Sequence, residues 1–161
     1  MAVVSNEERN INYDNFIDRL EIEVARAKRY ERVVSLCIIS IDGAGKKQEY
    51  DKAFLREFTR LVLEQARNVD ISVTISTEEF GLILPETGYN NALQAANRIK
   101  TAIEGYNFGD ENKEHKITVS IGVSAFPEHS NDSAELARRA MQAVSKATQS
   151  GGNRVVSASD I

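Results

Sequence analysis

Residues 33–41 read VVSLCIISI, an almost uninterrupted apolar run that is rich in β-branched side chains. Such a run is typical of a central strand that is covered on both faces. It stops at Asp42-Gly43-Ala44-Gly45, which is a turn sequence. The run contains Cys37, the only cysteine of the chain, so a disulfide framework is excluded. The sequence therefore predicts a buried strand at the centre of a sheet, followed by a tight turn.

Apolar periodicity on either side of this strand predicts helices and further strands. Spacings of three and four residues predict helices over 12–30, 52–67 and 90–106, and a last helix that starts near Asp132. Alternation predicts a hairpin around 73–84, a strand over 117–123 and a short strand over 154–156. Helices and strands thus interleave, and the hairpin makes the predicted sheet mixed.

The composition is that of one soluble globular domain with an excess of negative charge. The chain has 161 residues, a net charge of -4 and a pI of about 5.3, so it has no general attraction to nucleic acid or to an anionic membrane. An anionic ligand must therefore be held by a local cluster of Lys or Arg. No stretch approaches the apolar length of a membrane span, and no signal peptide is recognisable. We expect a cytoplasmic protein, or the cytosolic domain of a larger one.

Three segments, in the predicted order, resemble the GGDEF domain of diguanylate cyclases. Residues 117–124, ITVSIGVS, are similar to the family's late strand TVSIGV, and residues 151–155, GGNRV, resemble its closing GRNRV. Residues 80–85, FGLILP, are similar to the strand after the family signature, which then falls on Ser76-Thr77-Glu78-Glu79-Phe80. The resemblance implies an α+β fold in which helices flank a five-stranded, mostly antiparallel central sheet, as in nucleotidyl cyclases and polymerase palms. Residues 12–158 would form this domain, and residues 1–11 an N-terminal extension or linker.

The residues with which the family joins two GTP molecules are changed at several positions. The two glycines that let the nucleotide approach the backbone correspond to Ser76 and Thr77, and a β-branched residue should block that approach. The family's metal-binding Asp corresponds to Ser40. Glu78 and Glu79 without that third carboxylate make a poor Mg²⁺ site, and we interpret them as a solvated hairpin tip.

The contacts to the substrate are changed as well. The segment that reads guanine in the family has no counterpart in residues 46–50, and its phosphate-binding Lys and Arg correspond to Thr148 and Gly152. The sequence therefore predicts a degenerate, inactive domain with no catalytic residues, no cofactor and no functional magnesium site. Residual activity on GTP or a related nucleotide is a separate hypothesis, which a product assay tests.

A second site of the family is matched residue for residue. Arg67-Asn68-Val69-Asp70 has the R-x-x-D pattern of the family's product-inhibition site, at the same distance from the signature, and the resemblance places an additional Arg at Arg98. A guanidinium can donate two hydrogen bonds to guanine O6 and N7, and a carboxylate can accept from the guanine N1–H and N2–H groups. The same pattern also occurs as a surface ion pair, and Arg98 could equally be a solvated residue of a helix face.

These patterns lead to two main hypotheses. The first is a receptor module for cyclic di-GMP, bound by Arg67, Asp70 and Arg98, without catalysis. The resemblance implies that a stacked pair of ligand molecules could bridge two domains into a homodimer, and other domains or proteins of a signalling pathway would read the bound state. The alternative is a structural or protein-interaction module without nucleotide binding. His115 and His129 lie in polar segments, and we interpret them as surface histidines.

Overall fold

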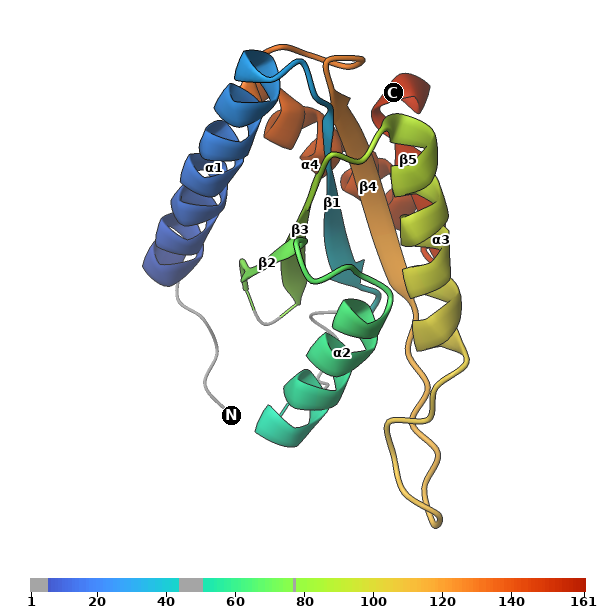
Figure 1. Cartoon of the computed structure of the whole chain (residues 1–161). Coiled ribbons are helices and arrows are strands. Elements are labelled where there is room, and N and C mark those ends of the chain that lie inside the picture. Colours follow the sequence, from blue (N-terminus) through green and yellow to red (C-terminus); the bar gives the residue numbers. More distant parts are fainter. Residues whose placement is uncertain (1–5, 44–50, 77) are drawn as a thin grey trace.

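The computed structural model describes residues 6–43, 51–76 and 78–161, with side chains from residue 12 onward (Figure 1). Its sheet has five strands in the order β2-β3-β1-β4-β5. The strands are β1 (Val34–Ile41), β2 (Ile71–Thr74), β3 (Glu79–Pro85), β4 (Val119–Phe126) and β5 (Arg154–Ser157). All neighbouring strands are antiparallel except β4 and β5. The predicted α+β fold with a mostly antiparallel central sheet is confirmed.

The apolar run at 33–41 forms the central strand, as predicted. β1 pairs with β3 on one side and with β4 on the other, and all its residues except Ser40 are buried. Alternate residues of a strand point to opposite faces of the sheet. Leu36 and Ile38 therefore join one hydrophobic cluster, whereas Cys37 and Ile39 join the other. Burial on both faces explains why the run is not broken by charged residues.

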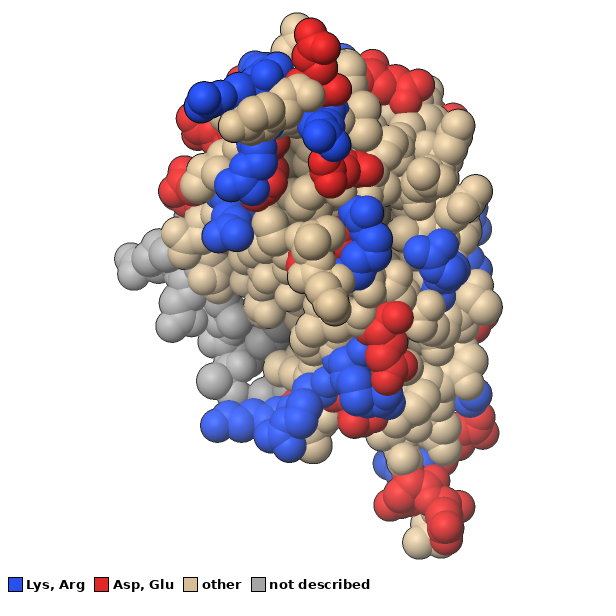
Figure 2. Space-filling model, viewed as in Figure 1, with Lys and Arg blue, Asp and Glu red and all other residues tan. Residues whose placement is uncertain are grey.

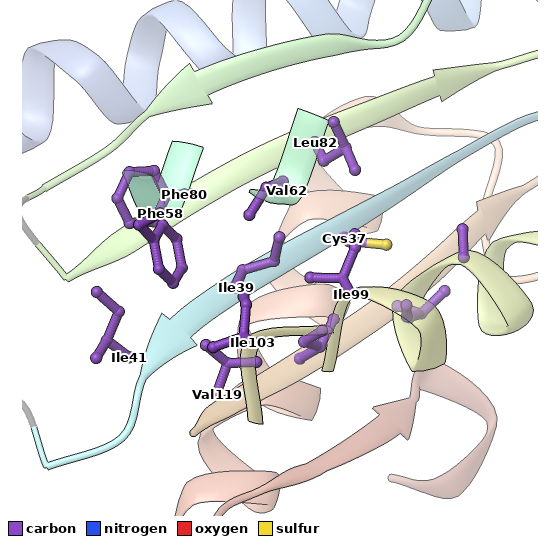
Figure 3. Close-up of a cluster of buried hydrophobic side chains, with 14 of the residues drawn as sticks. Cys37, Ile39, Ile41, Phe58, Val62, Phe80, Leu82, Ile99, Ile103 and Val119 are labelled. Atoms are coloured by element: carbon purple, nitrogen blue, oxygen red, sulfur yellow. The ribbon is translucent and has the colours of Figure 1, made fainter. Parts of the chain in front are cut away.

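Two helices cover each face of the sheet (Figure 1). α1 (Asn6–Arg29) and α4 (Ser133–Gln149) pack on one face, and α2 (Lys52–Glu64) and α3 (Tyr89–Glu104) pack on the other. Figure 3 shows part of the second cluster, where side chains of α2 and α3 meet those of the sheet. Among the described residues, no helix is both long and apolar enough to cross a bilayer.

Side-chain caps begin two of the helices. The Asp51 carboxylate accepts from the Phe54 N–H at 2.8 Å, and the Asp132 carboxylate accepts from the Glu135 N–H at 2.9 Å. Such a cap contributes about 1 kcal/mol to stability. The predicted start of the last helix near Asp132 is confirmed, and Asp132 is its cap.

Two helix ends differ from the prediction by three residues or more. α1 begins at Asn6 instead of residue 12, so it includes part of the segment that we expected to be a linker. α2 ends at Glu64 instead of residue 67, because the chain leaves the helix through a turn that connects to β2. This early end places Arg67 in the turn and not on the helix.

Candidate ligand-binding site

The turn between α2 and β2 is closed by the predicted Arg and Asp. The Asp70 N–H donates to the Arg67 carbonyl at 3.0 Å, which forms the turn. The Asp70 carboxylate accepts from the Arg67 N–H at 2.7 Å and from the Arg67 guanidinium at 3.1 Å. Both carboxylate oxygens therefore have a donor from the same residue. The two side chains lie together, as the three-residue spacing predicts.

The Arg67 guanidinium also holds the connection between β3 and α3. Its Nη2 lies 2.5 Å from the Pro85 carbonyl oxygen and 2.5 Å from the Thr87 hydroxyl. The Arg67 side chain is 52% exposed, whereas the Asp70 side chain is 2% exposed. The arginine thus covers the carboxylate and presents its own outer surface to solvent.

Arg98 lines the same surface depression as Arg67 and Asp70. The depression has a volume of about 240 Å³ and lies between the α2–β2 turn and α3. Among the described residues, Arg98 has no ion-pair partner closer than 4.0 Å. The structure therefore brings the three predicted binding residues to one place, and only one of the two arginines is matched by a carboxylate.

Two further polar side chains, from Asn91 and Gln94 on α3, line this depression. They were not predicted as site residues. With Arg98 they are spaced by three and four residues, so they share one face of the helix. This spacing is a signal that could have identified them once Arg98 had been chosen.

The thiol of Cys37 is buried in the core between the sheet and the helices α2 and α3. Burial and, to a smaller extent, the negative charge of Asp70 raise the pKa of the Cys37 thiol to about 12.

The signature position forms the hairpin between β2 and β3. The Ser76 hydroxyl is buried and accepts from the N–H groups of Glu78 and Glu79 at 3.2 and 3.1 Å. Glu78 and Glu79 are half-buried, so the prediction of a solvated tip is wrong in degree. Phe80 begins the buried part of β3 and packs on Phe58. Thr77 and the loop at 44–50 lie outside the described residues.

Asp42 has a structural role at the end of β1. Its carboxylate accepts from the Thr118 hydroxyl at 2.6 Å, the Ser120 hydroxyl at 2.6 Å and the Asn153 N–H at 2.8 Å. Gly152, at φ +76, lies so close that a Cβ would be 2.8 Å from this carboxylate. Asp42 therefore joins β1, β4 and the turn before β5. A glycine is required at residue 152, both for its positive φ and for this contact.

The other positions of the family's substrate site make internal contacts. Ser40 pairs with Glu79 of β3 and with Ser120 of β4. The Thr148 hydroxyl donates to the Val144 carbonyl at 3.0 Å, within α4. Within residues 6–43, 51–76 and 78–161, no group of three or more His, Cys, Asp or Glu side chains is arranged to hold a metal ion.

Both histidines are half-buried, and the ring of His115 stacks on Phe54. His129 Nδ1 accepts from the Ala125 N–H at 2.9 Å, and Nε2 lies 2.7 Å from the Ser159 hydroxyl. Its ring also meets Tyr89 edge-on. His129 thus joins the end of β4 to the short 3-10 helix at Ala158–Asp160, which corrects the sequence interpretation.

Comparison with known proteins identifies similar sequences and folds. The sequence pattern of the family described as "Diguanylate cyclase, GGDEF domain" matches residues 11–154. The response regulator PleD of Caulobacter vibrioides is 32% identical over 145 residues, which cover 86% of this chain and 32% of that protein. The chain spans about a third or less of the length of the curated relatives that it matches.

Two solved structures illustrate the similarity in fold. The GGDEF domain of YfiN, also called TpbB, from Pseudomonas aeruginosa has a TM-score of 0.82 and 18% identity, and the match covers 89% of this chain and 93% of that chain. The GGDEF domain of DgcB from Caulobacter crescentus, solved in complex with c-di-GMP, has a TM-score of 0.75 and 20% identity, with coverage of 89% and 88%.

Proposed function

Because this chain belongs to the diguanylate cyclase (GGDEF) domain family, we propose that it is a receptor for cyclic di-GMP that does not synthesise the dinucleotide. The observation that carries the proposal is the convergence of Arg67, Asp70 and Arg98 on one depression. A GGDEF domain with the same fold has been solved with this ligand.

The side chains at the depression match the hydrogen-bonding groups of guanine. Arg67 can donate to the guanine O6 and N7 atoms, and Asp70 can accept from the N1–H and N2–H groups. Arg98 can then pair with a phosphate or stack on a base. The volume of about 240 Å³ is below the range of about 300–1,000 Å³ for pockets that take drug-sized ligands. We therefore propose that one guanine enters the depression and that the rest of the ligand lies over Arg98.

Ligand binding would require Arg67 to exchange partners. Both oxygens of Asp70 accept from Arg67, and the carboxylate is 2% exposed. A guanine could reach these oxygens after the guanidinium has left Pro85 and Thr87. The exposed outer surface of Arg67 makes this movement compatible with the packing, because its side chain is not enclosed by the core.

Three features support the absence of cyclase activity. A buried Ser76 closes the hairpin where the family has a glycine, and Ser40 stands where the family has a metal-binding Asp. Asp42 already accepts from three donors. The expected result of incubation with GTP and Mg²⁺ is no dinucleotide product, and formation of any such product would refute this part of the proposal.

Calorimetry with cyclic di-GMP tests the receptor role. We expect Arg67→Ala and Asp70→Asn to weaken binding by about tenfold or more, because each removes a charge-assisted contact to guanine. Asp70→Asn keeps an oxygen acceptor for the Arg67 N–H, so it preserves the turn better than alanine. Arg98→Ala should weaken binding less.

The matched control is Arg56→Ala, which changes an exposed arginine on α2 for which no ion pair is seen among the described residues. This variant should bind as the parent does. Absence of binding at high micromolar ligand would remove the receptor hypothesis, and undiminished binding by both Arg67→Ala and Asp70→Asn would place the ligand elsewhere. Light scattering in the same titration measures whether the ligand joins two domains.

A specific observation favours the alternative of a module without nucleotide binding. Arg67 links Asp70, Pro85 and Thr87, and this set of contacts stabilises the α2–β2 turn without a ligand. Under this alternative, the parent chain shows no affinity for cyclic di-GMP. Arg67→Ala then only lowers the melting temperature. Arg67→Ala removes these contacts under either hypothesis, so the affinity for cyclic di-GMP measured by calorimetry separates the two functions.

A further inference from the structure

A second hollow, which we call the α1 groove, lies beside the depression. It runs between the C-terminal half of α1 and the turn before β2, has a volume of about 560 Å³, and is lined among others by Arg19, Arg26, Tyr30, Arg32, Val69 and Glu86. Of the six large apolar residues that are exposed among the described residues, three line this groove: Tyr30 at 57%, Val33 at 37% and Val69 at 60%. Exposed apolar side chains are thus concentrated in one concave place.

The groove is lined by three arginines and by three acidic residues, Glu23, Asp70 and Glu86. Figure 2 shows Lys and Arg side chains gathered over the end of α1, at the upper left. Arg26 pairs with the buried Glu23, and Arg32 pairs with Glu86 at 2.6 Å. Arg19 is exposed, and no carboxylate lies within ion-pair distance of it among the described residues. The groove therefore has an unmatched cation beside its apolar side chains.

The groove and the depression share a wall. Asp70 and Glu86 line both hollows. Arg67 contacts the Pro85 carbonyl, and the next residue, Glu86, pairs with Arg32 on the groove side. A change in the contacts of Arg67 would therefore act on Pro85, which directly precedes the groove residue Glu86.

We infer that the α1 groove docks an acidic segment of a partner protein that inserts an aromatic or branched aliphatic side chain between Tyr30 and Val69. The apolar side chains would bind this anchor, and the unmatched Arg19 would attract a flanking carboxylate. An anionic membrane is disfavoured as the partner, because a broad membrane surface would not enter the hollow that these apolar residues line.

The shared wall predicts that cyclic di-GMP changes the affinity of the groove for the acidic segment. This step rests on the proposed function. Cyclic di-GMP carries two negative phosphodiester groups, and its binding adds them to the depression, which shares Asp70 and Glu86 with the groove. Like charges in these two adjoining hollows repel through partly screened solvent. The acidic segment therefore binds more weakly when the ligand is present, and by linkage it weakens the ligand equally.

The experiment selects short peptides from a random phage-displayed library against the whole chain. A synthetic peptide of the consensus sequence is then titrated by fluorescence anisotropy. We expect acidic residues around one aromatic or branched aliphatic residue. Val69→Lys and Arg19→Glu should each weaken this peptide by about tenfold.

Two control variants match these changes in chemistry but lie on α2. Leu63→Lys alters another exposed apolar residue, and Arg56→Glu alters another exposed arginine. Both should bind the peptide as the parent does. Failure to select a peptide, a basic consensus, or equal weakening by the controls would overturn the inference. Sedimentation with phosphatidylserine vesicles that is lost in Val69→Lys, without peptide binding, would identify a membrane surface instead.

Saturating cyclic di-GMP should weaken the consensus peptide by about threefold. A chain that binds both molecules independently contradicts the coupling. A chain that binds the peptide but no cyclic di-GMP contradicts the proposed function and leaves the docking surface in place. The two failures are therefore distinguishable.

Discussion

Two carboxylates, Asp42 and Asp70, are held by donors of the protein in different ways. Asp42 accepts from Thr118, from Ser120 of β4 and from Asn153 in the turn before β5. A ligand that displaced these donors would break the contacts that hold the end of β1 to these segments. Among the described residues, Asp70 accepts side-chain hydrogen bonds from Arg67 alone. A guanine could take the place of one arginine donor without disturbing the sheet. This difference is the physical reason to assign the ligand to Asp70 and a structural role to Asp42.

His129 makes stability depend on pH. Burial lowers the pKa of His129 below its usual value. In the folded state Nδ1 accepts a hydrogen bond from the Ala125 N–H, so this nitrogen is unprotonated. The unfolded chain therefore binds a proton first as pH falls. The stability from this residue is complete above about pH 6.5, the pKa of an unperturbed His, and is lost as pH falls through the lower folded pKa.

Urea unfolding at pH 8 and at pH 5.5 measures this effect. We expect His129→Asn, whose side-chain oxygen can accept from Ala125, to lose less stability between these pH values than the parent. An equal loss in both proteins would mean that His129 does not titrate with folding.

At the scale of elements, the contact between β4 and α4 requires a residue without a side chain at Gly122. A Cβ on Gly122 would lie 2.2 Å from the Ala140 carbonyl oxygen and 2.5 Å from the Val144 nitrogen. Both contacts are with helix backbone, which cannot move aside without shifting α4. Ser124, further along the same strand, donates to the Leu136 carbonyl at 2.7 Å. The SIGVS sequence therefore sets how closely this helix lies on the sheet.

Gly122→Ala should lower the free energy of unfolding by about 1–3 kcal/mol or more, because it overpacks this contact. The control is Gly105→Ala at the end of α3, where φ is -81 and the nearest atom to a Cβ is 3.4 Å away. We expect the control to change stability by less than about 0.5 kcal/mol. Denaturant unfolding compares the two, and equal effects would show that α4 can shift away from β4.

At the scale of the whole molecule, the ligand site joins the connections before β2 and after β3 to α3, which packs on β1, β4 and β5. Arg67 and Asp70 come from the turn before the edge strand β2, Thr87 follows β3, and Arg98 lies on α3. A ligand that contacts all of them should stabilise the domain as one unit. At a ligand concentration of 100 times Kd, the stabilisation is about 2.7 kcal/mol.

Thermal unfolding with and without cyclic di-GMP tests this coupling. The melting temperature should rise by roughly 5–10 °C at that concentration, given the size of the domain. Arg67→Ala should show a much smaller rise. An unchanged melting temperature in the parent, at a ligand concentration that saturates it in calorimetry, would mean that the unfolded chain binds equally well.

The fold could be predicted closely because its signals are local. The buried run at 33–41 and the alternation in the neighbouring strands report which side chains face the core, and these predictions are confirmed. The ends of α1 and α2 were less well predicted, since a helix end depends on a few hydrogen bonds more than on periodicity. The spacing of Arg67 and Asp70 was also readable, because both residues lie within one turn.

The sequence by itself determined the order of the elements, the central strand and the pairing of Arg67 with Asp70. Only the tertiary structure decided that Arg98, Asn91 and Gln94 face this pair, that Asp42 is enclosed by its donors, and that His129 is held at both ring nitrogens. The donors to Asp42 lie between 76 and 111 residues away along the chain. Local periodicity carries no record of such partners, because they meet only when the sheet brings β1, β4 and β5 together.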